Sequence, residues 1–315
     1  MYKIAHVDAT SVVDAQAQLA KGKAMAMAGG TDLVTYLKGM ITPNAPTTVV
    51  NLKTIPNLAY IKEEGGMLKI GALATLTAIA NSATVKGNYA ALAQSALAVG
   101  APELRNMGTI GGNICQRPRC LYFRNEYNSF NCLRKNSSGL CYALLGENTY
   151  HSIFGAVGGC VAVCPSDTAV ALVAFGASIV TNKKTWKAAD FFAPTGEQIN
   201  AIAADEIVTE VQVPTPAAGT KSTYLKFAFR KAIDFPLVSV AVVTGANPAV
   251  VLGGVAGAPR VATAAQDAIK GKAIDATSAA AAGDASITGA VALTKNKYKL
   301  QIAKTLVKRA LLSVK

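Results

Sequence analysis

The pattern of hydrophobic and polar residues changes period twice near the start of the chain. In residues 12–20 the apolar side chains recur at helical spacing, which predicts an amphipathic helix capped by Thr10 or Ser11. Residues 23–28 form a short apolar run that is typical of a strand. Residues 33–40 return to helical spacing and predict a second helix. The start of the chain is therefore predicted to be a small α/β unit.

A glycine pair, Gly29 and Gly30, lies between this strand and this helix. Glycine lets the backbone approach a phosphate without a Cβ clash, and free amides at a helix start supply donors. The same pair is also compatible with an ordinary turn. A second glycine-rich turn, Gly-Thr-Ile-Gly-Gly-Asn at 108–113, favours one extended dinucleotide that contacts both turns. Neither turn has the spacing of a Rossmann fingerprint or of a P-loop, so neither fold is predicted.

Alternation and helical spacing continue in the middle of the chain. Residues 67–73 alternate like a strand, and residues 75–81 and 89–99 predict helices, the first capped by Thr75. Residues 168–174 are a buried element, either strand or helix. These segments predict a second α/β region.

The C-terminal part has its own pattern. Residues 223–230 and 237–243 have strand composition, and the last predicted helix places Leu300, Ala303, Val307, Ala310 and Leu311 on one side. Residues 215–220 are a plausible linker. We expect three parts, at residues 1–52, 53–214 and 221–315.

Composition and charge limit the function classes. Hydrophobic residues make up 51% and charged residues 16% of the chain, as in an ordered globular protein. The net charge is +13, but the basic residues are dispersed without a nucleic-acid-binding signature, so a nucleic-acid partner is not expected. Polar residues interrupt the most apolar windows, around 168–180 and 238–256, before they reach membrane-spanning length. With no signal peptide visible, we expect a cytoplasmic location and no membrane span.

Residues 115–164 are rich in asparagine, serine and glycine and contain all six cysteines of the chain. Long loops without structure are uncommon inside compact domains, so a bound metal is expected to order this one. In a cytoplasmic protein, cysteines favour metal binding or free thiols over disulfides. Zinc is the alternative to an iron–sulfur cluster. The two histidines, His6 and His151, are expected to be structural.

Five motifs in order carry a family resemblance: Ala28-Gly-Gly-Thr-Asp-Leu33, Thr109-Ile-Gly-Gly-Asn113, Pro165-Ser-Asp167, Glu206-Ile-Val-Thr209 and Leu225-Lys226 with Arg230. With them the chain resembles the FAD-binding subunits of the molybdenum hydroxylases, the xanthine dehydrogenase family. That resemblance implies a fold of the α+β class, with a two-part FAD-binding domain of the vanillyl-alcohol-oxidase type and a C-terminal α+β domain. Between the second and third motifs lies an insert of 51 residues. It is similar to the extra [4Fe–4S] loop found in the bacterial aldehyde oxidoreductase flavin subunit and the 4-hydroxybenzoyl-CoA reductase β subunit.

The resemblance also implies which residues contact FAD. Asp167 would bind the adenosine end of FAD, and Lys226 would make a polar contact with the cofactor. The full implied set is Met25, Ala26, Met27, Ala28, Gly29, Gly30, Thr31, Asp32, Leu33, Val99, Gly108, Thr109, Gly112, Asn113, Asp167, Ile207, Val208 and Lys226.

For the cluster, the family pattern implies four ligands, Cys120, Cys132, Cys141 and Cys160. The other two cysteines, Cys115 and Cys164, are expected to be buried and inert, although Cys164 lies close enough in sequence to Cys160 to replace it. No molybdopterin or [2Fe–2S] site is visible, so the resemblance places those centres on partner chains.

The resemblance thus implies an electron-transfer subunit of a heterotrimer. Electrons would pass between the partner chains' molybdenum and [2Fe–2S] centres and an external acceptor or donor. The flavin is the redox group, so no catalytic side chain is expected. A stand-alone flavin oxidase or dehydrogenase, and a non-enzymatic assembly subunit with a structural metal site, are the alternatives. A periplasmic location is compatible with export together with a partner that carries the signal.

Overall fold

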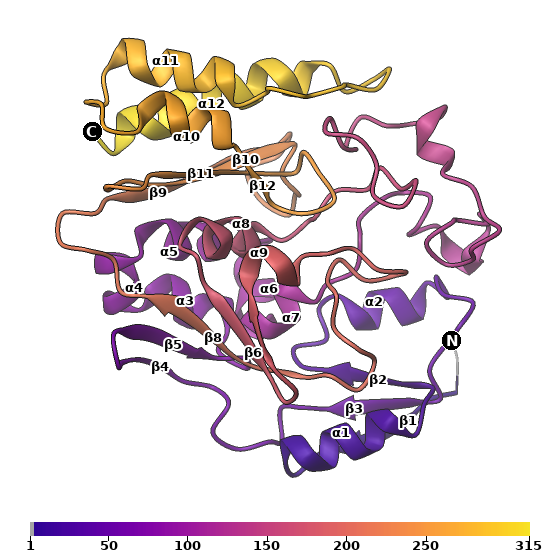
Figure 1. The fold of residues 1–315 in the computed structure, drawn as a ribbon. Helices are drawn as coiled ribbons and strands as arrows, with labels where there is room; N and C mark the ends of the chain where they lie inside the picture. Colours follow the sequence, from indigo (N-terminus) through magenta and orange to yellow (C-terminus); the bar gives the residue numbers. More distant parts are fainter. Residues whose placement is uncertain (1–2) are drawn as a thin grey trace.

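A computed structural model describes residues 3–315, and it consists of three stacked parts and one long loop (Figure 1). The first part is a parallel sheet of order β1-β3-β2 with two helices. The side chain of Ser11 caps the first helix by accepting from the Asp14 N–H at 3.1 Å, which confirms one of the two predicted caps. The elements are β1 (Ala5–Asp8), α1 (Val12–Ala20), β2 (Ala24–Met27), α2 (Leu33–Lys38) and β3 (Thr48–Asn51).

The second part is an antiparallel sheet of order β4-β5-β8-β6-β7 packed against a layer of short helices. Its strands are β4 (Ile61–Glu64), β5 (Met67–Gly71), β6 (Ser178–Thr181), β7 (Thr185–Lys187) and β8 (Val208–Pro214). Its helices are α3 (Leu76–Asn81), α4 (Ala83–Asn88), α5 (Ala90–Leu97), α6 (Pro102–Met107), α7 (Ile110–Ile114), α8 (Asp167–Ala174) and α9 (Ala188–Phe191). The predicted Thr75 cap is confirmed, and the buried element around residue 170 is a helix, α8.

The third part is an antiparallel sheet of order β12-β11-β10-β9. Helices α10–α12 cover one face, and α5 and α8 of the second part cover the other (Figure 1). Both faces are covered because successive side chains of the central strand β10 point to opposite sides. Val240 and Val242 belong to the core under α12, whereas Ala241 and Val243 belong to the core of the second part. The elements are β9 (Ser222–Phe227), β10 (Val238–Val243), β11 (Ala249–Gly253), β12 (Arg260–Val261), α10 (Thr263–Ile269), α11 (Ala276–Ala285) and α12 (Tyr298–Ser313).

The insert between α7 and α8 contains only two short 3-10 helices, η1 (Glu126–Asn128) and η2 (Tyr142–Leu144). It contacts the first part, where the Tyr127 N–H donates to Gly39 O at 2.9 Å, and the third part, where Ile153 O accepts from the Val291 N–H at 2.7 Å. The rings of Tyr122, Phe130 and Tyr142 pack on one another inside the insert, with centroids 5.0–5.9 Å apart. The insert therefore connects the two ends of the molecule (Figure 1).

No helix within residues 3–315 combines the length and apolar character needed to cross a lipid bilayer.

Candidate functional site

A cavity of about 830 Å³ lies where the first part, the second part, the start of the insert and the β9–β10 loop of the third part meet. Its size lies within the range of small-molecule and cofactor sites. The structure brings most of the predicted FAD residues together here. The predicted residues that line it are Met25, Ala26, Met27, Ala28, Gly29, Gly30, Thr31, Asp32, Leu33, Val99, Gly108, Thr109, Gly112, Asn113 and Asp167. We call it the main cavity.

The two glycine turns lie against each other at the wall of the main cavity. A Cβ atom on Gly29 would lie only 1.9 Å from Met107 O, so only glycine permits this approach. Gly30 has a φ of +72°, a conformation that also favours glycine. Backbone packing therefore brings together two glycine turns that are far apart in sequence, as expected for an extended ligand.

Gly112 lies in the short helix α7, whose cap is Thr109. The Thr109 hydroxyl accepts from the Gly112 N–H at 3.1 Å, so it is already engaged by the backbone. A Cβ atom on Gly112 would meet only that hydroxyl oxygen within 4 Å. At this position the wall of the main cavity is thus bare backbone, as a close-lying cofactor requires.

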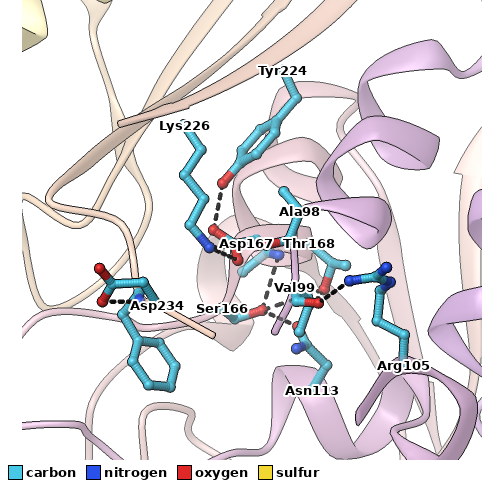
Figure 2. A network of polar contacts seen from close by, with 12 residues as sticks. Ala98, Val99, Arg105, Asn113, Ser166, Asp167, Thr168, Tyr224, Lys226 and Asp234 are labelled. Atoms are coloured by element: carbon cyan, nitrogen blue, oxygen red, sulfur yellow. Dashed lines mark hydrogen bonds and ion pairs between the residues drawn. The ribbon is translucent and has the colours of Figure 1, made fainter. Parts of the chain in front are cut away.

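Asn113 joins α7 to the start of α8 (Figure 2). Its Oδ1 atom accepts from the hydroxyls of Ser166 at 2.6 Å and Thr168 at 2.7 Å. Ser166 also caps α8 by accepting from the Ala169 N–H at 3.1 Å. The amino group of the Asn113 side chain is left to donate to a ligand in the cavity.

Asp167 is the buried carboxylate of the main cavity, and its side chain is held from the third part (Figure 2). Lys226 Nζ lies 2.8 Å from Asp167 Oδ2 and also donates to Ala98 O at 3.0 Å, while the Tyr224 hydroxyl donates to Asp167 Oδ1. Burial raises the pKa of Asp167 above its ordinary value, against the opposing effect of Lys226. Lys226 itself does not line the cavity; it positions the carboxylate that does.

The motif at 206–209 contributes a residue other than those predicted. Ile207 packs in the core of the first part and Val208 in the core of the second, and neither lines the cavity. Glu206 does line it. Its carboxylate accepts from Thr181 at 2.7 Å and from the Trp186 ring N–H at 2.8 Å, so it braces the wall.

Asp32 is bound by arginines of the insert, which the sequence did not assign to this cavity. Asp32 Oδ1 lies 2.8 Å from Arg119 Nη2 and 2.7 Å from Arg124 Nη2, and Oδ2 accepts from the Arg117 N–H at 2.8 Å. Burial opposes ionisation of this carboxyl, but the two guanidinium groups outweigh burial and lower its pKa. Arg119 lies over the Phe235 ring, 4.6 Å from its centroid.

Other lining residues were also not predicted, because they lie outside the positions that the five motifs assign to FAD. The Arg117-Pro-Arg119 stretch was the available signal, since two cations beside a glycine turn suit an anionic ligand. The additional lining residues are Ala24, Thr35, Asn44, Leu76, Gly100, Leu104, Cys115, Gln116, Arg117, Arg119, Pro165, Gln198, Ile202, Ala203, Ala204, Glu206, Ile233, Asp234 and Phe235.

The four predicted cluster ligands line a second, small pocket in the insert, which we call the cysteine pocket. Its lining is Cys120, Tyr122, Phe123, Cys132, Leu133, Arg134, Cys141, Tyr142, Ala143, His151, Cys160 and Ala162. The other two cysteines lie elsewhere: Cys115 lines the main cavity, and Cys164 packs in the core of the second part.

The cysteine pocket is not a finished metal site. No group of three or more His, Cys, Asp or Glu side chains within residues 3–315 is arranged to hold a metal ion. Burial raises the pKa of the Cys120 thiol to about 12. This thiol is therefore protonated near neutral pH, and a bound cation would have to displace its proton.

One short segment connects the two sites. Gln116, Arg117 and Arg119 line the main cavity, and Cys120 lines the cysteine pocket. A ligand in each site would therefore be separated by little more than this stretch of chain.

Comparisons with known proteins match the whole chain. Residues 2–216 match the family described as FAD binding domain in molybdopterin dehydrogenase, and residues 223–314 match the CO dehydrogenase flavoprotein C-terminal domain. The chain is 32% identical over 289 residues to the aldehyde oxidoreductase FAD-binding subunit PaoB of Escherichia coli (strain K12), covering 88% of this chain and 87% of that protein. It is 25% identical to the nicotine 6-hydroxylase medium subunit of Paenarthrobacter nicotinovorans, covering 82% and 77%.

Among solved structures, a chain of carbon monoxide dehydrogenase from Hydrogenophaga pseudoflava superposes with a TM-score of 0.77 at 26% identity, covering 99% of this chain and 97% of that one. This likeness and the two family matches confirm the predicted α+β fold with an FAD-binding domain and a C-terminal domain. The matched proteins are oxidoreductase subunits, and this chain is likewise an oxidoreductase subunit. The chain belongs to the FAD-binding subunits of the molybdenum hydroxylase family.

Proposed function

We propose that this chain binds FAD in the main cavity and a [4Fe–4S] cluster in the cysteine pocket, and transfers electrons within a heterotrimeric molybdenum hydroxylase. The observation that carries the proposal is the segment 116–120, which lines both sites. When bound, FAD exchanges electrons singly or in pairs, whereas an iron–sulfur cluster exchanges them one at a time. The chain would thus connect centres that differ in the number of electrons they take.

The side chains and backbone around the main cavity would bind and orient FAD. The glycine turns offer bare backbone to the pyrophosphate, Asn113 offers an amino group, and Asp167 offers a buried acceptor. Arg117 and Arg119 add positive charge that suits an anionic ligand. Direct contact of Ile207, Val208 and Lys226 with FAD stays a prediction of the sequence.

For the cysteine pocket, the donor set suits iron and sulfide. A single zinc ion would need four sulfur atoms at about 2.3 Å from one centre. In a cubane each thiolate binds a different iron, so its ligands surround a larger group. The four cysteines that line one pocket match the four thiolate ligands that a cubane needs. Zinc in a structural site is the alternative, and the experiment below distinguishes it from the cluster.

The partners in this proposal are a molybdopterin-binding large subunit and a [2Fe–2S] small subunit, together with an external electron acceptor or donor. The net charge of +13 makes electrostatic contact with those chains plausible in physical terms. The domain limits 1–52, 53–214 and 221–315, and a cytoplasmic location, also stay predictions.

The test is the cofactor content of protein purified without oxygen. We expect one FAD and about four iron atoms per chain, as for one cubane with four cysteine ligands, and FAD that an artificial donor reduces. Zinc in place of iron would contradict the cluster, and FAD that no donor reduces would favour an assembly subunit. Copurification from the native cell with two partner chains is expected. A lone chain with full substrate turnover would favour the stand-alone flavin oxidase.

A further inference from the structure

His151 is an unexplained polar residue in the cysteine pocket. Its side chain is only 3% exposed, and neither ring nitrogen has a hydrogen-bond partner in the described part of the chain. The backbone around it, in contrast, is fully engaged. Its N–H donates to Asn148 O at 3.0 Å, and its carbonyl accepts from Asn296 Nδ2 and Lys299 Nζ, each at 3.0 Å. The residue is thus fixed in place while its ring is unpaired.

A buried ring without partners is costly. Leaving a buried donor or acceptor unpaired costs about 1–3 kcal/mol, and folded proteins contain few such groups. Burial and the nearby Lys299 lower the pKa of His151 to about 4, so the ring is neutral and carries one N–H donor near neutral pH. No sequence motif places this histidine beside the cysteines, and a purely structural role leaves its ring nitrogens unexplained.

Two other donors in the cysteine pocket contact a cysteine sulfur. Arg134 is 8% exposed, its Nη1 atom lies 4.0 Å from Cys160 Sγ, and its Nε atom has no partner among residues 3–315. The Ala162 N–H donates to Cys160 Sγ at 3.4 Å. The pocket therefore combines four thiol ligands with N–H groups that suit sulfur acceptors.

We propose that His151 donates its ring N–H to a sulfur atom of the cluster and thereby raises the cluster's reduction potential. This inference rests on the cluster proposed above. Reduction adds one electron, and no bond forms or breaks while His151 keeps its proton. A hydrogen bond to sulfur stabilises the more negative, reduced form, and such bonds are among the means by which proteins tune these potentials.

The test compares His151→Phe, which removes the donor at similar size, with His151→Gln, which keeps an N–H donor. Both are made in the full chain, and the readout is the midpoint potential of the cluster from a redox titration followed by electron paramagnetic resonance. In His151→Phe we expect the one-electron equilibrium to move about tenfold toward the oxidised cluster, which corresponds to about 59 mV. In His151→Gln we expect most of that shift to be recovered. His6→Phe, at an exposed position in β1, is the matched control and should leave the potential unchanged.

Iron content and nitrogen coupling separate the other outcomes. An unchanged potential in His151→Phe with about four iron atoms retained would overturn the inference. Loss of iron in both His151 variants would overturn it too, because the ring would then hold the loop or bind iron. If His151→Phe loses iron but His151→Gln keeps it at the wild-type potential, the donor role is supported. Strong nitrogen coupling in pulsed spectra of the wild-type cluster would show direct ligation and overturn it. A wild-type protein without iron would instead contradict the proposed function itself.

Discussion

The main cavity is walled by regular elements, whereas the cysteine pocket is walled by a loop. The close approach of Gly29 to the Met107 backbone at the end of α6 fixes one wall of the main cavity, and the protein's own packing requires glycine at position 29. The cysteine pocket lies in an insert whose only helices are the short η1 and η2, and it keeps buried thiols and an unpaired histidine together. The main cavity is thus held by the protein's own backbone. The cysteine pocket contains buried polar atoms without a partner in the described part of the chain, so we expect its order to depend on the proposed cluster.

The largest effect is expected from the ligand cysteines, which test whether the cysteine pocket depends on a cluster. Serine at Cys120, Cys132, Cys141 or Cys160 should reduce iron from about four atoms per chain to near zero, because a cubane needs all four thiolates. FAD content should stay near one, since the main cavity is built without these side chains.

The matched control is Cys164→Ser. Cys164 is 3% exposed and lies four residues beyond Cys160, but it packs in the core of the second part. Iron should stay near four in this variant. Loss of iron in Cys164→Ser together with retention in Cys160→Ser would show that the fourth ligand has been assigned to the wrong residue.

A second prediction concerns the preformed main cavity. Gly29→Ala would place a Cβ atom 1.9 Å from Met107 O and 2.6 Å from Met107 C, and both are backbone atoms that cannot move independently. We expect a loss of at least the upper end of the about 1–3 kcal/mol typical of overpacking, together with loss of FAD. Denaturant unfolding and the flavin absorbance per chain would measure both effects.

Two glycine variants sharpen this result. Gly87→Ala in α4 has nothing within 4 Å of the new Cβ, so the protein should gain about 0.5–1 kcal/mol. Gly112→Val should keep stability near the wild type but lose FAD, since only Thr109 Oγ1 lies near its Cβ. Retention of FAD with wild-type affinity in Gly112→Val would show that the cofactor does not lie against this turn.

The fold and the glycine turns were predictable because they depend on local signals. Strand, glycine pair and helix follow one another at Gly29, and a glycine turn with a hydroxyl cap follows at Thr109, so periodicity and backbone chemistry suffice. The α+β class and most of the cavity lining came from the family resemblance that these and three further motifs carry. Element ends were less certain: the helix expected at 33–40 ends at Lys38, and the strand expected at 223–230 ends at Phe227.

What the sequence did not reveal depends on contacts between distant segments. The pairing of Asp32 with Arg119 and Arg124 joins residues about ninety positions apart, and no local pattern indicates it. The role of Lys226 as the partner of Asp167 is of the same kind. His151 was expected to be structural because the two histidines of the chain could form a metal site only together with carboxylates. Only its burial in the cysteine pocket distinguishes it.

A third prediction tests the buried pair behind the main cavity. Lys226→Met would leave Asp167, whose side chain is 4% exposed, without its cation. Removing one partner of a buried ion pair typically costs about 3–5 kcal/mol, so unfolding should occur at markedly lower denaturant. Lys62→Met breaks the exposed pair with Glu64 and should change stability little. Equal effects of the two variants would mean that the Asp167 site does not depend on Lys226.

The smallest effect on stability is expected at the exposed ion pair between Glu147 of the insert and Lys295 of the third part. Glu147 accepts from the Thr149 hydroxyl and N–H and pairs with Lys295 at 3.0 Å, and these contacts lower the pKa of Glu147 to about 2 from an ordinary value of 4.5. Because the folded-state pKa is the lower one, the contribution to stability is complete above pH 4.5 and declines as the pH falls toward 2.

Glu147→Gln cannot titrate, so its unfolding free energy should fall less steeply than that of the wild type between pH 4.5 and 2. The measurement is denaturant unfolding at several pH values in protein stripped of cofactors, so that cluster loss in acid does not add to the slope. Glu126→Gln is the control in the same insert, since Glu126 makes no ion pair with any residue in 3–315. If the unfolding free energy of Glu147→Gln fell with pH as steeply as that of the wild type, the Glu147 contacts would not stabilise the insert. The cysteine pocket would then depend still more on its ligand for order.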